Sequence, residues 1–319
     1  MNGRQRIDVH HHILPPRYTS WLRAHGIEHA GGRELPAWSV ESTLRMMDEN
    51  EIARAIVSVS APGVQLDPDK RDDASARATA REVNEFNARV VADHPDRFGF
   101  FATLTLPDVE GALAEAEYAL DELGAAGVIL LANTHGEYLG APALQELFAE
   151  LDDRRSVVFV HPNALPGPSV PGVPPFAADF LLDTTRAAFR LVQSGAPRRF
   201  PNLRIILSHA GGFVPYAAYR LAIAMVEEGK GRIAEQLGEK LEDFRSFYFD
   251  TAISGTPAAL PSLLAFAKPG HVLFGSDWPF LPAVAIRAIT ALLDGHSALD
   301  ADGHAAIDHV NARALFTEK

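Results

Sequence analysis

The feature that most constrains the fold is an alternation of short apolar runs with longer, mostly amphipathic segments along the whole chain. Short apolar runs predict buried strands, and the longer segments predict helices. Strands are predicted at residues 6–12, 53–60, 98–103, 127–131, 157–161, 204–208, 247–251 and 272–276. Helices are predicted between them, at residues 40–50, 74–94, 109–123, 141–153, 176–195, 214–227, 257–267 and 282–294.

Eight successive β–α units are the number that closes a parallel barrel. The alternative is an open doubly wound sheet, which usually has a glycine-rich phosphate loop where this chain has histidines. We therefore predict an α/β fold, a (β/α)8 barrel that forms one domain over residues 1–319, with a closing helix at 301–319. Three long segments, at 18–39, 61–73 and 162–175, follow strands, so they are expected at the carboxyl end of the barrel, where active sites are built.

The composition excludes several kinds of partner and site. With 47% hydrophobic residues among 319, the chain can bury a large core. The net charge of −12 argues against nucleic acid or an anionic membrane as a partner. No run approaches the roughly 18 apolar residues of a membrane span, and there is no signal core, so a cytoplasmic enzyme is expected. Because the chain has no cysteine, any metal must be bound by nitrogen and oxygen.

Imidazoles at alternate positions end the first predicted strand. Because successive strand side chains point to opposite faces, His10 and His12 should share one face, with Asp8 one layer deeper and His11 facing the helices. Two imidazoles on one rigid face form half of a site for zinc or a similar ion. The other interpretation is an expression-tag remnant, which is disfavoured because the histidines are embedded in strand residues.

Three more polar residues follow apolar strands: His161, His209 and Asp277. Taken alone, each is more typical of a hydrogen-bonded structural residue or a helix cap. In a barrel, however, they would meet the histidine pair at one end. His10, His12, His161 and Asp277 could then give three nitrogens and one oxygen to a single divalent ion, and His209 would remain as an acid or base.

Four motifs containing these residues resemble the amidohydrolase superfamily. They are the Asp-x-His-x-His strand at 8–12, His-Pro at 161–162, Ser-His-Ala-Gly-Gly at 208–212 and Gly-Ser-Asp-Trp-Pro-Phe at 275–280. More narrowly, they resemble its decarboxylase branch, which includes aminocarboxymuconate-semialdehyde, γ-resorcylate and 6-methylsalicylate decarboxylases. The resemblance spans nearly the whole chain. It implies that the four donors are metal ligands and that His209 is catalytic.

The resemblance also implies roles for two residues outside the donor set. Phe280 corresponds to an aromatic residue that lines the substrate ring in the salicylate-type enzymes. Arg220 corresponds to an arginine that binds a substrate carboxylate across a dimer interface, although a surface helix charge is an equally good interpretation. A homodimer or a dimer-based oligomer is therefore expected.

The metal centre is expected to hold one ion. Binuclear hydrolases of the superfamily usually carry a bridging carboxylated lysine or a glutamate at the end of the fourth strand. Here residues 128–135 read Val-Ile-Leu-Leu-Ala-Asn-Thr-His and contain neither. Zinc suits the nitrogen-rich donor set, and manganese is the alternative.

The donor set alone supports two reactions. In nonoxidative decarboxylation of a small salicylate-type or related conjugated acid, the ion holds the carboxylate and a neighbouring oxygen while Asp277 or His209 protonates the ring carbon. In hydrolysis of a small lactone or amide, the ion instead activates water. The absent bridging lysine, the Gly-Gly after His209 and Phe280 favour the first, so we predict a carboxy-lyase. A non-catalytic metal-binding barrel is the third alternative, which the free histidine and the long loops disfavour.

Overall fold

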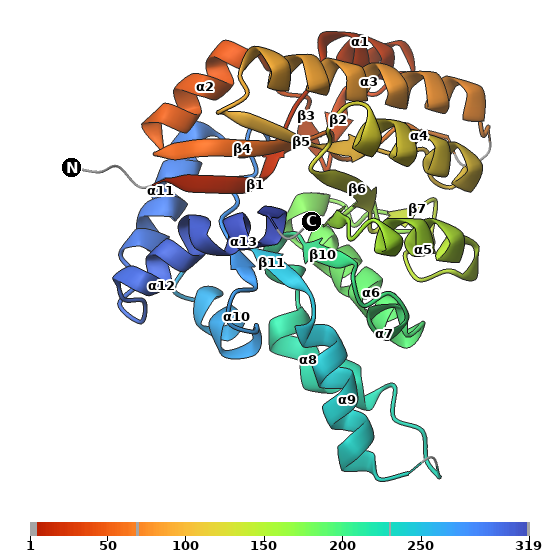
Figure 1. The fold of residues 1–319 in the computed structure, drawn as a ribbon, viewed down its shortest axis with the longest axis vertical. Helices are drawn as coiled ribbons and strands as arrows, with labels where there is room; N and C mark the ends of the chain where they lie inside the picture. Colours follow the sequence, from red (N-terminus) through yellow and green to blue (C-terminus); the bar gives the residue numbers. More distant parts are fainter. Residues whose placement is uncertain (1–4, 68–69, 230, 318–319) are drawn as a thin grey trace.

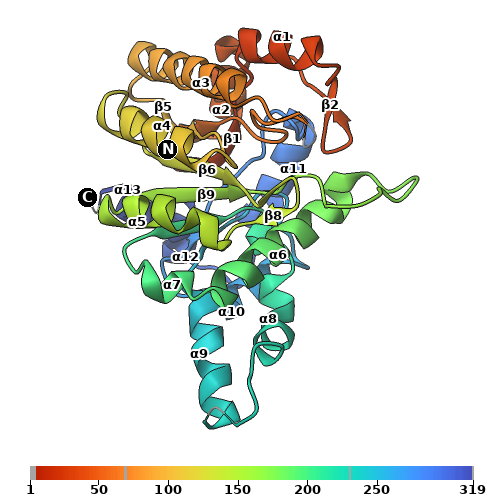
Figure 2. The ribbon, with the colours of Figure 1, turned by 90° about the vertical axis from the view of Figure 1, so that its right-hand side faces the viewer.

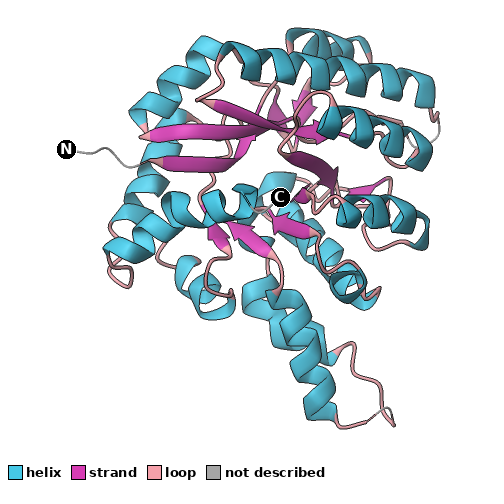
Figure 3. Cartoon of the chain, viewed as in Figure 1, coloured by secondary structure: helices cyan, strands magenta, loops and turns pink. Residues whose placement is uncertain are grey.

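The computed structural model describes residues 5–67, 70–229 and 231–317. Its main sheet has eight parallel strands in the order β1-β4-β5-β6-β9-β10-β11-β12 (Figures 1 and 3). The strands are β1 (Arg6–His12), β4 (Ile52–Ser58), β5 (Phe98–Thr103), β6 (Gly127–Leu131), β9 (Val157–His161), β10 (Arg204–Leu207), β11 (Tyr248–Asp250) and β12 (Val272–Leu273). Seven of them agree with the predicted segments to within two residues at each end, and β12 begins as predicted but ends three residues earlier.

The sheet closes where the first strand meets the last. The backbone N–H of Val9 donates to the carbonyl of Phe274 at 3.0 Å, and His11 forms a parallel bridge with Trp278. The predicted (β/α)8 barrel is therefore confirmed.

Helices connect the strands and surround them (Figure 1). The longer ones are α2 (Val40–Glu49), α3 (Asp73–Asp93), α4 (Val109–Asp121), α5 (Gln145–Asp153), α6 (Asp179–Gln193), α8 (Val214–Ile223), α9 (Ile233–Arg245), α10 (Leu260–Phe266) and α11 (Ala283–Asp294). Polar caps fix several starts: Asp72 accepts from the Ser75 N–H before α3, and Asp108 accepts from the Gly111 N–H before α4. A short helix α7 (Ala196–Arg199) precedes β10, and single turns η1 (Pro142–Leu144), η2 (Pro175–Ala177) and η3 (His209–Gly211) occur in the connections.

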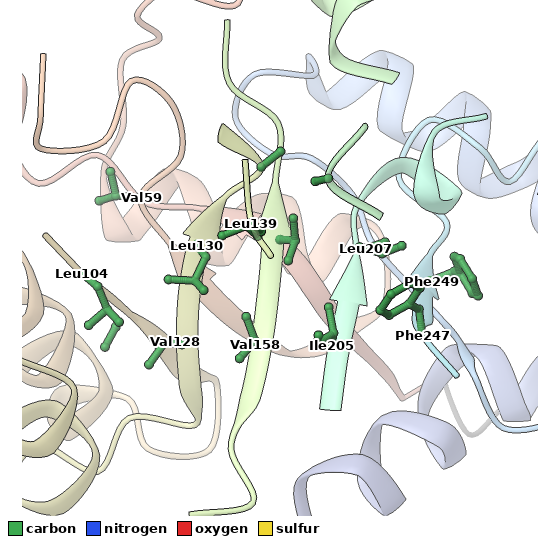
Figure 4. Packing of buried hydrophobic residues seen from close by; sticks show 14 of the residues in the cluster. Val59, Leu104, Val128, Leu130, Leu139, Val158, Ile205, Leu207, Phe247 and Phe249 are labelled. Atoms are coloured by element: carbon green, nitrogen blue, oxygen red, sulfur yellow. The ribbon is translucent and has the colours of Figure 1, made fainter. Parts of the chain in front are cut away.

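Alternate strand residues form two apolar layers. Outward-facing side chains pack against the helices, and Figure 4 shows Val128, Leu130, Val158, Ile205 and Leu207 side by side in this outer layer. Inward-facing side chains between them fill the barrel interior. The near-continuous apolar character of the strands follows from burial on both faces.

The chain after α11 closes the amino end of the barrel. It forms α12 (Ala301–Ala305), a π-helical turn η4 (Ala306–Val310) and α13 (Asn311–Thr317), which fit the predicted closing helix up to residue 317; the last two residues of that prediction lie outside the described residues. Ala312 and Leu315 pack onto the inward-facing strand residues. Arg6 donates to Asp308 at 3.1 Å and so ties the first strand to this segment.

Three segments contain regular structure that the sequence pattern did not predict. The long segment after β1 forms α1 (Pro16–Ala24) and a hairpin of β2 (His29–Ala30) and β3 (Arg33–Glu34). After β10, α8 and the unpredicted α9 project away from the barrel as a pair (Figures 1 and 2). A second small hairpin, β7 (Asn133–Thr134) with β8 (Glu137–Tyr138), follows β6.

Among the described residues, every helix is too short or too polar to span a lipid bilayer.

Candidate active site

The histidine pair lies at the carboxyl end of β1, inside the barrel and fully buried. The Nε2 atoms of His10 and His12 are 3.1 Å apart. The rings meet edge to face, with centroids 4.9 Å apart. The sequence pattern predicted this convergence, and the structure confirms it.

Strict alternation fails just before the pair. Ile7 and Val9 also face the barrel interior, because a β-bulge inserts one residue between Asp8 and His11 relative to β4. The bulge turns Asp8 away from the face on which we had placed it, so that prediction was wrong. His11, as predicted, lies apart from the other histidines, and its Nδ1 bonds Asp8 at 2.8 Å.

Asp8 instead joins β1 to the turn that carries Asp277. Its carboxylate accepts from the backbone N–H of Ser276 at 3.0 Å and from the Ser276 hydroxyl at 2.5 Å. The Asp277 N–H donates to the carbonyl of His10 at 2.8 Å. These bonds hold the turn that follows β12 against the end of β1, next to the histidine pair.

The three other predicted residues converge on the same point. Ligand atoms of His10, His161, His209 and Asp277 all lie within 4.8 Å of one another. Asp277 is central: its Oδ1 is 3.3 Å from His10 Nε2 and 3.2 Å from His12 Nε2, and its Oδ2 is 3.5 Å from His209 Nε2. All five side chains therefore face one centre.

Hydrogen bonds divide the four histidines into two kinds. Nδ1 of His10 bonds an oxygen of Asp250 at 2.7 Å, Nδ1 of His12 the carbonyl of Ser58 at 3.3 Å, and Nδ1 of His161 the carbonyl of Pro162 at 2.8 Å. Because these oxygens accept, each Nδ1 carries the hydrogen and each Nε2 lone pair points to the centre. Nδ1 of His209 is buried and has no hydrogen-bond partner among the described residues.

The electrostatics of the cluster suit a cation. Burial alone would lower the pKa of His10, but Asp250 and Asp277 raise it to about 10. Burial and the neighbouring histidines hold the pKa of His161 well below its usual value. Burial would raise the pKa of Asp277, yet His10 and the other imidazoles hold it well below its ordinary range. Asp277 is thus ionised and His161 is a neutral donor, while the carboxylates around His10 favour positive charge at its Nε2, which a metal ion can supply in place of a proton.

This donor set fits a divalent metal ion. Four donors at about 2.0–2.1 Å from one ion are separated by about 3.3 Å in a tetrahedron. The separations among His10, His12 and Asp277 are 3.1–3.3 Å. Nitrogen and carboxylate donors with Nδ1 hydrogens held by oxygens are the usual arrangement around zinc and related ions.

An apolar pocket opens directly onto the cluster. It encloses about 470 Å³, part of it open to solvent, and His161, His209 and Asp277 form its polar end. Phe176, Phe180, Ile253, Phe280 and Leu281 supply most of its wall. The Phe280 ring meets His12 edge to face with centroids 5.5 Å apart, so the structure places this predicted residue beside the donors.

Arg33, from the β2–β3 hairpin, is the cation among the pocket-lining residues. Its guanidinium lies 4.0 Å from the ring centre of Phe176. No ion pair of Arg33 occurs within the described ranges. Sequence reasoning missed Arg33 because it lies in an insertion with no strand or helix pattern.

Asp250 was missed as well, although it lies one residue before the end of the predicted seventh strand, and it is the last residue of β11. Arg220, in contrast, was predicted as a substrate-binding residue. It lies on the exposed face of α8 and is not among the residues that line the pocket of its own chain.

Comparison with known proteins agrees with this geometry. A family model described as amidohydrolase matches residues 7–317. The chain belongs to the amidohydrolase family. A crystal structure of an amidohydrolase II, structural genomics target LpR24, has 30% identity and a TM-score of 0.89, covering 98% of this chain and 100% of that one.

Two decarboxylases are among the similar proteins. The 6-methylsalicylic acid decarboxylase acuB of Aspergillus aculeatus is 39% identical over 314 residues, covering 93% of this chain and 91% of the relative. A crystal structure of 2,6-dihydroxybenzoate decarboxylase complexed with 2,6-dihydroxybenzoate has 25% identity and a TM-score of 0.76, with 99% of each chain covered.

Proposed function

We propose that this amidohydrolase-family protein is a metal-dependent carboxy-lyase that removes carbon dioxide, without oxidation, from a small salicylate-type or related conjugated carboxylic acid. The observation that carries the proposal is the meeting of a metal-type donor cluster with a pocket walled by phenylalanine rings. Such a pocket holds an aromatic ring by apolar contact and leaves its polar groups at the donors. The similarity to a 6-methylsalicylic acid decarboxylase supports this substrate class.

His10, His12, His161 and Asp277 would hold one divalent ion, with zinc favoured by the three nitrogens and manganese as the alternative. The division of the histidines supports this assignment, because the Nε2 lone pairs of the first three are fixed toward the centre. When bound, the ion supplies positive charge for the substrate carboxylate and for negative charge developing on the neighbouring oxygen.

His209 and Asp277 would handle the proton. Decarboxylation breaks the bond between the ring carbon and the carboxylate, releases carbon dioxide and leaves that carbon with a proton in its place. His209 Nε2 is 3.5 Å from Asp277 Oδ2, and both residues line the pocket. A proton carried by this pair is therefore within reach of a ring held there.

The pocket walls would orient the ring. Phe280 and Phe180 approach the donors from two sides, since Phe280 contacts His12 and Phe180 contacts His161 edge to face at 5.9 Å. Arg33 offers hydrogen bonds and positive charge to a further polar substituent. The aromatic walls also exclude water from the reacting carbon.

A homodimer would use the exposed face of α8. Tyr216, Tyr219 and Ile223 are 88%, 69% and 50% exposed and lie on one side of the helix with Arg220. Apolar side chains gathered on one exposed helix face are typical of an interface. In such a dimer Arg220 would bind the substrate carboxylate at the partner's site. Sedimentation should show a dimer for the wild type and a monomer for Tyr216→Ser/Tyr219→Ser.

The activity test is carbon dioxide release from a panel of hydroxybenzoates by metal-loaded protein. We expect release from 6-methylsalicylate or a related hydroxybenzoate, with the matching phenol as co-product. Benzoate, which lacks the hydroxyl, and protein stripped by a chelator are the controls. Absence of carbon dioxide across the panel, with acid released from lactones or amides, would replace the proposal by a hydrolase.

A further inference from the structure

We infer that Asp250 is a positioning residue. One of its carboxylate oxygens orients the ring of the proposed metal ligand His10, and the other holds the backbone of the proposed proton-transfer residue His209. This inference rests on the proposed metal site. Asp250 ends β11 and is fully buried. Its Oδ2 is 2.7 Å from Nδ1 of His10, while its Oδ1 accepts from the backbone N–H of His209 at 2.9 Å and of Ala252 at 3.0 Å.

The bond to His10 determines which ring nitrogen is free. A carboxylate can only accept, so Nδ1 of His10 carries a hydrogen, and when a metal ion is bound Nε2 is the nitrogen left to coordinate it. That Nε2 is the atom facing His12 and Asp277. Carboxylate partners of this kind orient a ligand histidine and raise its basicity.

The bond to His209 fixes an unusual stretch of backbone. His209 and Ala210 have φ of +53° and +57°, and Gly211 and Gly212 follow with +73° and +64°. Residues other than glycine rarely adopt positive φ unless surrounding contacts stabilise that conformation. The buried Oδ1 of Asp250 gives that support where the stretch begins, and so determines where the His209 ring lies.

The segment after β12 leaves room for the His10–Asp250 pair. A Cβ built on Gly275 would lie 2.9 Å from Cβ of His10 and 3.2 Å from Cβ of Asp250. Gly211 is similarly close to Phe249, the residue before Asp250: its Cβ would lie 2.8 Å from the Phe249 ring. Gly275 therefore leaves the space that the His10–Asp250 pair occupies, and Gly211 leaves the space of the preceding Phe249 ring.

Asp250→Asn tests the inference because the amide keeps the shape and changes one hydrogen bond. Its oxygen can still accept from the His209 N–H, but its NH2 would face His10 Nδ1 and favour the tautomer with hydrogen on Nε2. We expect the metal affinity of metal-free protein, measured by chelator competition, to fall about 10–100-fold. In the His10→Ala background the same substitution should change metal affinity less than twofold, because the effect passes through His10.

Asp152→Asn is the matched control. Asp152 is a buried carboxylate that accepts backbone N–H groups of Asn202 and Leu203 before β10, away from the cluster. It should lower thermal stability and leave metal affinity unchanged. If Asp250→Asn folds and its metal affinity is within twofold of the wild-type value, the inference is wrong. If the wild type binds no divalent ion, the proposed function is wrong as well.

A measurement on the wild type covers the case in which Asp250→Asn does not fold. Nitrogen-15 NMR of the histidine rings distinguishes the two tautomers of His10 in the metal-loaded protein. Hydrogen on Nδ1, with Nε2 as the metal ligand, is the expected result. A metal bond at Nδ1 would contradict the positioning role while leaving the metal site intact.

Discussion

The two ends of the barrel interior are built by the same strands and have opposite chemistry. At the amino end, Ile7, Phe101 and Ile206 pack against Ala312 and Leu315 of α13. At the carboxyl end the same strands and their neighbours present histidines and aspartates to an open pocket. In β9 the change takes two residues, from Phe159 in the apolar layer to His161 in the cluster.

The difference shows how the fold separates stability from chemistry. Apolar burial at the amino end favours folding roughly in proportion to the area removed from water. Buried ionisable groups at the carboxyl end oppose folding unless they are paired or bind a cation. Substitutions at the two ends should therefore change different observables, and the predictions below test that separation.

The largest effect is expected for His209→Asn at the carboxyl end. It removes the proposed proton-transfer group while the four proposed ligands remain, so kcat should fall by about 10²–10⁴-fold. Metal content, measured by elemental analysis, should stay at the wild-type value. Purification of this variant without metal would show that His209 is a ligand.

Leu315→Ala at the amino end should have the next largest effect, and on stability alone. Leu315 is 2% exposed in the inner apolar layer, and truncating a buried leucine costs about 2–5 kcal/mol of unfolding free energy. Urea denaturation measures the loss, and Leu315→Met, which nearly conserves volume, should cost less than about 1.5 kcal/mol. A large fall in kcat of folded Leu315→Ala protein at 25 °C would show that stability and chemistry are not separated between the two ends of the barrel.

A smaller effect is expected for Phe280→Ala at the pocket wall. Loss of its ring should raise KM for a hydroxybenzoate about tenfold, because burying an aromatic side chain is worth roughly 1.5–3 kcal/mol and part of that contact is with the substrate. Steady-state kinetics at saturating metal measure it, with Phe280→Leu as the milder comparison. An unchanged KM would remove Phe280 from the substrate contacts.

Much of this architecture could be predicted from the sequence, for physical reasons. Strands buried on both faces give short apolar runs such as 157–161, and ligands that follow such runs must share one end of a barrel. Asp8 was misplaced because the extra residue of a β-bulge leaves no mark in a string of strand residues. Helices α1 and α9 lie in insertions whose structure depends on contacts that periodicity does not encode. The role of Arg220 involves a second chain, which one sequence does not position.

The central claim is that one divalent ion at the carboxyl end supports carbon dioxide release. The most direct measurement is a titration of chelator-treated protein with zinc or manganese, followed by the rate of carbon dioxide release from a substrate identified in the panel. The account predicts negligible activity without metal and a linear rise that ends at one ion per chain. Full activity in metal-free protein, or a rise that continues to two ions per chain, would contradict it.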